Sequence, residues 1–305
     1  MPCVKLDRIM RWVPWIFAWL SIALSPAQVL QWTREQMIQY TAENPFERFD
    51  DGRPKVPEAL LDRLRQLSAE DCWGVLRAAG YNNQFEGNWR ILHPGKKLVG
   101  RAVTAVFMPE RPDLESIIRA QFKARNFPSR GHQYVLDLLQ EGDVLVVDCW
   151  GKVPGFVGNN LATYLMVATK SGGLVVDGGI RDLEDLQNVD VQIYYRFAHP
   201  DPVSNFTLVG VNVPVRIGNA TVLPGDVVLG DREGVTFIPP SLVQKVVDNA
   251  IEIQIHDEWT QMKLRTGKYK SHEIYSRPRD PELIREYEEY RQRRYRELGL
   301  EPPKR

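Results

Sequence analysis

The sequence has few cysteines and no excess of positive or negative charge. Its 305 residues include only Cys3, Cys72 and Cys149, with neither a CxxC pair nor the Cys/His spacing of a zinc site. Basic and acidic residues balance at 39 each. The chain therefore exerts no overall electrostatic attraction on nucleic acid, and binding to a polyanion would need a local patch. We expect buried thiols and no nucleic-acid partner.

Histidine pairs with metal-binding spacing are also absent. None of the five histidines falls into an HxxxH or HExxH pattern, and we interpret each of them as a structural or surface residue. The chain has no internal repeat and no low-complexity tract. These absences leave the fold to be predicted from local periodicity.

No apolar run is long enough to span a membrane, and the longest apolar run lies near the N-terminus. Lys5, Arg8 and Arg11 precede the 13 apolar residues 12–24, and the small residues of 25–27 follow. This layout predicts a secretory signal peptide at residues 1–27, cleaved after Ala27, and an exported protein, periplasmic or secreted. The run is too short for a stable membrane span, which needs about 20 apolar residues. An uncleaved signal anchor is the alternative.

The rest of the chain predicts an α/β domain with extensions at both ends. Residues 28–56 are polar and form a leader that wraps over the domain. Apolar, β-branched runs predict strands at residues 98–108, 143–149, 173–177, 209–217, 227–230 and 235–238. Helical spacing occurs at residues 57–80, 160–170, 241–258 and 281–298. The domain covers residues 57–262, and residues 263–305 form a charged helical extension that either lies on the surface or packs on a neighbouring subunit.

Ser68 and Asp71 have the spacing of a helix-capping box, with Asp in the position usually held by Glu. The strand at 143–149, the helix at 160–170 and the strand at 173–177 form a βαβ unit, which is right-handed in nearly all proteins. Ligands of open α/β sheets lie beyond the carboxyl ends of the strands, so the loops that leave these two strands can line one pocket.

These two loops carry the candidate chemistry. The segment Gly158, Asn159, Asn160 and Leu161 starts a helix and presents backbone N–H groups that suit a carboxylate. Arg181 can hold a carboxylate or an enolate oxygen through its forked guanidinium. Asp182 supplies the hard oxygen that Mg²⁺ or Mn²⁺ prefers, and Asp177 and Asp185 lie close by in sequence. A salt-bridging turn is the structural alternative for the Arg-Asp pair.

The segment 174–186, LVVDGGIRDLEDL, resembles the VVxDGxxRDxxxL signature of the RraA-like proteins. Three further stretches are similar to family motifs and follow in family order: HPGKKLVGRAVT at 93–104, GDVLVVD at 142–148 and NVPVRIGNATVLPGDVVLGDREGVTFIP at 212–239. The resemblance covers about residues 58–260. It implies a compact α/β/α fold of the swivelling β/α/β type, assembled as homotrimers or hexamers with active sites between subunits.

The resemblance also implies a reaction. Enzymes of this family include 4-hydroxy-4-methyl-2-oxoglutarate aldolase and oxaloacetate decarboxylase, which cleave a C–C bond of a small 2-oxo acid through a pyruvate enolate. By resemblance, residues 158–161 bind substrate through backbone amides, Arg181 binds substrate, and Asp182 binds Mg²⁺ or Mn²⁺. A glutamate from the last helix of the next subunit completes the outer metal shell, with Glu258 or Glu252 as the candidate here.

Two departures from the family pattern keep other functions open. Family enzymes usually carry an acidic residue in the loop where this chain has Asn159 and Asn160, and the Ser-Asp-Ala-Leu helix start is replaced by residues 73–76, WGVL. The alternatives are a binding or regulatory protein without catalysis, and a lyase or hydrolase acting on a larger sugar-derived acid. Family members that inhibit a ribonuclease lack the metal aspartate, whereas Asp182 is present here.

Overall fold

The computed structural model describes residues 31–303, except for residues 125, 128–130 and 277. The predicted signal sequence at residues 1–27 lies outside the described residues, so its cleavage and the export of the chain stay predictions. Among the described residues, no helix combines the length and the apolar character needed to cross a membrane.

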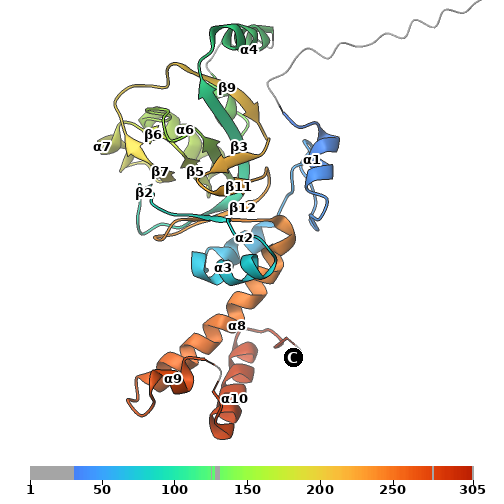
Figure 1. Ribbon diagram of the computed structural model, residues 1–305, viewed down its shortest axis with the longest axis vertical. Coiled ribbons are helices and arrows are strands. Elements are labelled where there is room, and N and C mark those ends of the chain that lie inside the picture. The colour runs from blue at the N-terminus through green and yellow to red at the C-terminus, as the bar shows by residue number, and fades with distance from the viewer. Residues whose placement is uncertain (1–30, 125, 128–130, 277, 304–305) are drawn as a thin grey trace, which may run out of the picture.

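A mixed sheet of nine strands forms the centre of the body (Figure 1). Its middle strands are parallel neighbours in the order β3 (Leu98–Pro109), β4 (Asp143–Asp148), β5 (Gly173–Val176) and β7 (Gln192–Tyr195). Antiparallel strands extend this group: β12 (Val227–Gly230), β13 (Val235–Ile238) and β1 (Phe85–Glu86) beside β3, β9 (Phe206–Val211) along the second half of β3, and β2 (Arg90–Ile91) beside β7. Strands β4 and β5 are buried on both faces, which accounts for their uninterrupted apolar sequence.

The predicted βαβ unit is confirmed, with α6 (Asn159–Thr169) connecting β4 to β5. The single strand predicted over residues 209–217 is wrong, because β9 ends at Val211 and a separate strand, β10 (Val215–Ile217), follows. Asn212 lies between them with φ of 49°, a left-handed conformation that interrupts a strand. Strand β10 pairs with β11 (Ala220–Val222) in a hairpin.

Helices cover one face of the sheet. The helices α4 (Pro112–Ala124), α5 (Gly131–Leu136), α6 and α7 (Leu183–Leu186) share a core with β3, β4 and β5. The helices α2 (Glu58–Leu64), α3 (Ala69–Ala78) and α8 (Pro240–Leu264) pack over β12 and β13. The hairpin β10–β11 packs on the opposite face. The predicted α/β class with a helical C-terminal extension is therefore confirmed.

The helical stretch predicted over residues 57–80 consists of two helices, α2 and α3. The capping box that begins α3 is confirmed: the Ser68 hydroxyl accepts from the backbone N–H of Asp71, and the Asp71 carboxylate accepts from the backbone N–H of Ser68. Helix α8 extends to Leu264, six residues beyond the predicted end at Glu258. Ion pairs and aromatic contacts with the C-terminal segment support these added turns.

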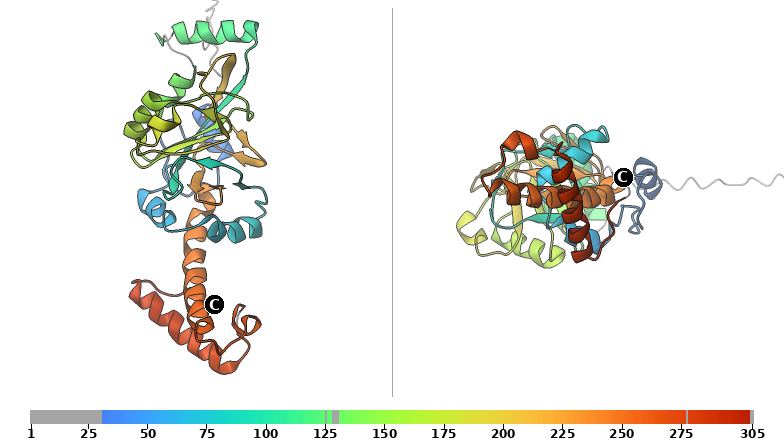
Figure 2. Two further views of the ribbon diagram at one scale, coloured as in Figure 1. Left: turned by 90° about the vertical axis from the view of Figure 1, so that its left-hand side faces the viewer. Right: turned by 90° about the horizontal axis from the view of Figure 1, so that it is seen from below.

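The C-terminal half of α8 leaves the body and, with α9 (Ser271–Ile274) and α10 (Pro281–Glu297), forms a C-terminal arm (Figures 1 and 2). These elements have a small core of their own around Trp259, Ile274 and Tyr287. Helix α10 is thus more than a solvated surface helix, because Tyr287, Arg291 and Tyr295 are buried. Arg291 pairs with Glu252 of α8 at 2.7 Å, and Arg294 pairs with Glu258 at 2.9 Å.

Candidate active site

The loops that follow β4 and β5 run side by side. The backbone N–H of Gly179 donates to the carbonyl of Val153 at 2.8 Å, and Phe156 N–H donates to Gly179 O at 2.7 Å. The N–H of Arg181 then donates to Val157 O at 3.0 Å. Both loops leave carboxyl ends of parallel strands, so they meet at one edge of the sheet, as the sequence predicts.

This pairing brings Arg181 and Asp182 to the start of α6. The Asp182 carboxylate accepts from the backbone N–H of Asn159 at 3.2 Å, and its other oxygen lies 3.6 Å from the Arg181 guanidinium. Each of the two side chains is about a third exposed, at 37% and 34%. Asp182 has a φ of 60°, a left-handed conformation that is uncommon outside glycine and is often found at functional sites.

Gly158 makes this close approach possible. A Cβ atom at Gly158 would lie 2.2 Å from Asp182 Oδ2 and 3.1 Å from Arg181 Cγ, so any other residue here would force the Asp182 carboxylate to move. Gly158 is also the N-cap of α6 and has no side chain to cap the helix. The N–H groups of Asn160 and Leu161 at this helix start are therefore left for solvent or a ligand.

Asp177 and Asp185 do not belong to this group. Asp177 is buried, and its carboxylate accepts from Arg196 Nε at 2.7 Å. Arg196 also pairs with Glu86 at 2.8 Å and stacks over the ring of Trp89. This network is a structural ion-pair cluster. Asp185 lies exposed on α7.

One wall of the site could not be predicted from local sequence patterns. Strand β6 (Gly179–Ile180) pairs in parallel with β8 (Phe197–Ala198), and the N–H of His199 donates to Ile180 O at 3.0 Å. A Cβ at Gly155 would lie 2.1 Å from Asp201 O and 3.0 Å from Arg181 Cδ. The segment 199–201 therefore lies beside the stem of Arg181, although nothing in its composition marks it as part of a site.

Two polar groups at the end of β4 have perturbed acidities. Burial raises the pKa of the Asp148 carboxyl, whose oxygens accept from the N–H groups of Trp150 and Arg216. Burial also raises the pKa of the Cys149 thiol well above its ordinary value, so it is no nucleophile. Both cysteines of the described chain, Cys72 and Cys149, are buried, as predicted, and both are free thiols, which the sequence left open.

The donor set at Asp182 fits a divalent cation that keeps much of its water. Within residues 31–303, apart from the few positions not described, no three His, Cys, Asp or Glu side chains cluster in a way that could hold a metal. Mg²⁺ is commonly bound through one or two carboxylates together with water and substrate oxygens. Asp182 is accessible, and its Oδ1 lies 3.6 Å from the guanidinium of Arg181, beyond hydrogen-bonding distance. This oxygen is therefore available to such a metal ion.

A family model described as RraA-like, Aldolase/RraA, matches residues 59–237, more than half of the chain. The chain belongs to the RraA-like family. This match includes Gly158, Arg181 and Asp182 and ends before α8, so Glu252, Glu258 and the C-terminal arm lie outside it. The role that the resemblance gives these two glutamates stays a prediction, since within this chain both pair with arginines of α10.

Individual relatives share limited parts of the chain. The protein DlpA of Legionella pneumophila is 25% identical over 212 residues, covering 68% of this chain and 32% of that protein. The 4-hydroxy-4-methyl-2-oxoglutarate aldolase of Thermus thermophilus is 33% identical over 108 residues, covering 34% of this chain and 64% of the aldolase. The chain thus spans between about a third and two-thirds of the length of these curated relatives.

A solved structure supports the fold. RraAS2 of Streptomyces coelicolor, described as an unusual member of the RNase ES inhibitor RraA protein family, is 30% identical with a TM-score of 0.60. The similarity covers 68% of this chain and 100% of RraAS2. An uncharacterized protein from Pseudomonas syringae has a TM-score of 0.58 at 22% identity, which supports the fold alone.

Proposed function

We propose that this RraA-like protein is a divalent-metal-dependent lyase that cleaves a C–C bond of a small 2-oxo acid. The observation that carries the proposal is the convergence of Arg181, Asp182 and the free N–H groups of α6 around Gly158. This arrangement joins a fixed cation, a carboxylate and a helix N-terminus, which together match an anionic substrate and a hard metal ion. The aldolase among its relatives is consistent with such chemistry.

In the proposed reaction, the guanidinium of Arg181 and the N–H groups of Asn160 and Leu161 hold the substrate carboxylate. Asp182 and water would hold Mg²⁺ or Mn²⁺, which when bound would neutralise negative charge that develops on the 2-oxo oxygen. The C3–C4 bond breaks with its electron pair left on the three-carbon fragment, which is a pyruvate enolate until water protonates C3. The other fragment leaves as CO2 from oxaloacetate, or as a second pyruvate from 4-hydroxy-4-methyl-2-oxoglutarate once its C4 hydroxyl has given its proton to water. Arg181 keeps its charge throughout, so it stabilises this enolate without exchanging protons.

The test is release of pyruvate from oxaloacetate and from 4-hydroxy-4-methyl-2-oxoglutarate with Mg²⁺, with Mn²⁺ and with EDTA. Blanks without protein are needed, because metal ions alone speed the decarboxylation of oxaloacetate. We expect release that requires metal and falls by at least 100-fold in Asp182→Asn. Asp185→Asn, an exposed carboxylate on α7 three residues away, is the matched control and should keep the wild-type rate.

A binding protein without catalysis is the second candidate, and the similarity to RraAS2, which covers all of RraAS2 and 68% of this chain, favours it. Folded protein that releases no pyruvate from either substrate with any metal would reject the lyase proposal. Activity only on a larger sugar-derived acid would retain the metal chemistry and change the substrate.

A further inference from the structure

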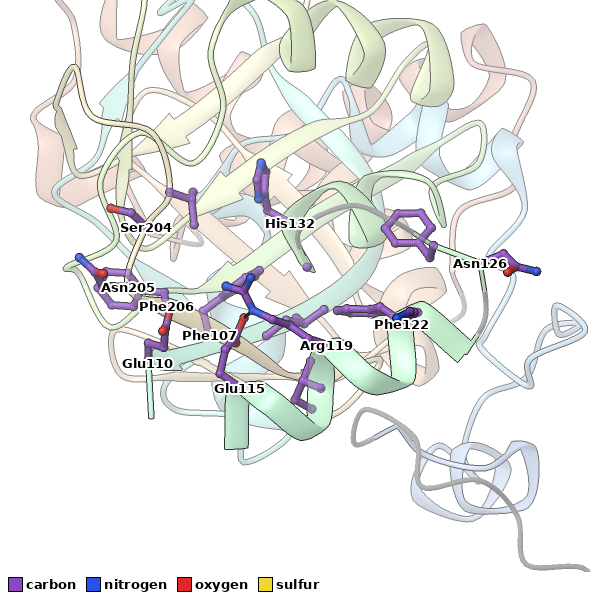
Figure 3. A pocket seen from close by; sticks show the side chains of 16 residues that line it. Phe107, Glu110, Glu115, Arg119, Phe122, Asn126, His132, Ser204, Asn205 and Phe206 are labelled. Atoms are coloured by element: carbon purple, nitrogen blue, oxygen red, sulfur yellow. Dashed lines mark hydrogen bonds and ion pairs between the residues drawn. The ribbon is translucent and has the colours of Figure 1, made fainter. Parts of the chain in front are cut away.

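A cavity lies outside the candidate active site. It has a volume of about 750 Å³ and is lined by α4, β9, the segment 203–205 and residues 126, 127, 131 and 132 (Figure 3). It includes none of the residues 158–161, 181 or 182. Cavities that bind small organic ligands commonly measure about 300–1,000 Å³ and are mostly apolar with a few polar groups. The cavity is therefore of a size that suits a ligand of its own.

The floor of this cavity is apolar and largely aromatic. Phe107, Phe122 and Leu208 are almost completely buried there, at 3%, 5% and 2% exposure, and Phe206 adds a further ring. These side chains come from β3, α4 and β9, so the floor is part of the packed core and is preformed. The partly exposed rings of Phe127 and Phe206 supply the apolar surface that a ligand can reach, and they favour a ligand with apolar groups.

The charged residues around the cavity are arranged by sign. In the middle, Glu115 is neutralised by Arg119 at 2.6 Å and also accepts from the hydroxyl of Thr207. Glu110 lies before the start of α4 and Lys123 lies near its end, and neither has an ion-pair partner among the described residues. The helix between them is roughly 20 Å long at about 1.5 Å per residue.

Two charges of opposite sign at the two ends of an apolar cavity match an elongated zwitterion. The charges of a single amino acid are too close together to reach both ends. An extended peptide of three residues separates its terminal ammonium and carboxylate by roughly 10 Å, which the long side chains of Glu110 and Lys123 can bracket. Amide side chains at the rim, Asn126 and Asn205, have the donors and acceptors that a peptide backbone requires.

We propose that this cavity binds a short apolar peptide in an extended conformation, with the ammonium at Glu110 and the carboxylate at Lys123. The large side chains of the peptide lie on the aromatic floor, and the Glu115–Arg119 pair faces the middle of the backbone. The proposal does not depend on the lyase activity, because the cavity and the candidate active site share no lining residue.

The experiment is a calorimetric titration of the protein with the tripeptide Leu-Phe-Leu, its N-acetylated form, its C-terminal amide, and Gly-Gly-Gly. We expect saturable binding of Leu-Phe-Leu, no binding of Gly-Gly-Gly, and roughly threefold to fivefold weaker binding when either terminal charge of the ligand is removed. Glu110→Gln should abolish the difference between the free and acetylated peptides, and Lys123→Gln the difference between the free peptide and its amide. Both substituted positions are exposed, so folding is preserved.

Two control variants show whether the peptide binds in this cavity or elsewhere on the protein. Ile117→Ser changes an exposed apolar residue of α4 that does not line the cavity, and Asp182→Asn changes the candidate active site. Both should leave peptide binding unchanged. The proposal is overturned by absence of binding at millimolar peptide, by equal affinity for all three apolar peptides, or by loss of binding in Asp182→Asn. A lower oligomeric mass of Lys123→Gln in sedimentation would also overturn it and assign the cavity to a contact between copies of the chain.

Discussion

The guanidinium of Arg53 and the carboxylate of Asp143 form a two-pronged ion pair, with N–O distances of 2.7 and 3.1 Å. Both side chains are almost completely buried, at 1% and 0% exposure. Arg53 belongs to the polar leader and Asp143 begins the central strand β4. The pair therefore fixes the leader to the middle of the sheet, 90 residues away in sequence.

Arg53→Met should lower the free energy of unfolding by about 3–5 kcal/mol, because it leaves the Asp143 carboxylate buried without its cation. Urea unfolding followed by circular dichroism measures the change. Arg111→Met removes an exposed pair with Asp113 and should leave the free energy of unfolding nearly unchanged, because water screens this pair. Equal losses in the two variants would contradict the anchoring role of Arg53.

Gly158→Ala should lower kcat/KM for pyruvate release at least tenfold without unfolding the protein. The added Cβ would meet Asp182 Oδ2 at 2.2 Å, so the carboxylate must move away from the start of α6. Gly74→Ala is the matched control, because a Cβ there meets no atom within 4 Å and an alanine in α3 stabilises the helix by about 0.5–1 kcal/mol. Steady-state kinetics and thermal melts of both variants check this, and full activity in Gly158→Ala would rule out the proposed geometry.

Asp226 should make stability depend on pH. Burial raises the pKa of its carboxyl to about 7, while the unfolded chain has the ordinary value of 3.8. Between about pH 4 and pH 7 the folded state therefore keeps a proton that the unfolded state loses. The free energy of unfolding is highest below about pH 4 and falls as pH rises to about 7. In Asp226→Asn this pH dependence should disappear. Urea titrations at several pH values between 4 and 8 measure it, and parallel profiles for the two proteins would contradict the assignment.

Glu252→Gln should destabilise the C-terminal arm by about 1–3 kcal/mol, because its partner Arg291 is only 3% exposed, although Arg291 keeps Glu288 at 2.9 Å as a second carboxylate. Glu258→Gln should have a smaller effect, below about 1 kcal/mol, since Glu258 and Arg294 are 46% and 28% exposed. Hydrogen exchange of the α10 amides measures both changes. The same two variants test the predicted outer-shell role, which requires the metal concentration for half-maximal activity to rise in one of them.

Much of the fold was predictable because the signals are local. Apolar, β-branched runs predicted β4 and β5, helical spacing predicted α6, and Ser68 with Asp71 predicted the start of α3. The left-handed turn at Asn212 was not predictable, because its apolar neighbours on both sides continue the strand pattern. Within residues 57–80, Ser68 with Asp71 marked where the second helix begins, but the end of α2 at Leu64 was not predictable, since periodicity alone does not show where a helix stops.

The sequence by itself determined the family, the βαβ unit and the identities of Arg181 and Asp182, because these depend on residues near each other along the chain. Only the tertiary structure decided that Asp177 pairs with Arg196, that residues 199–201 lie beside Arg181, and that the leader is anchored by Arg53. It also decided that α10 engages Glu252 and Glu258. These contacts join segments far apart in sequence, and their free energy comes from burial and charge pairing that exist only after the sheet has formed.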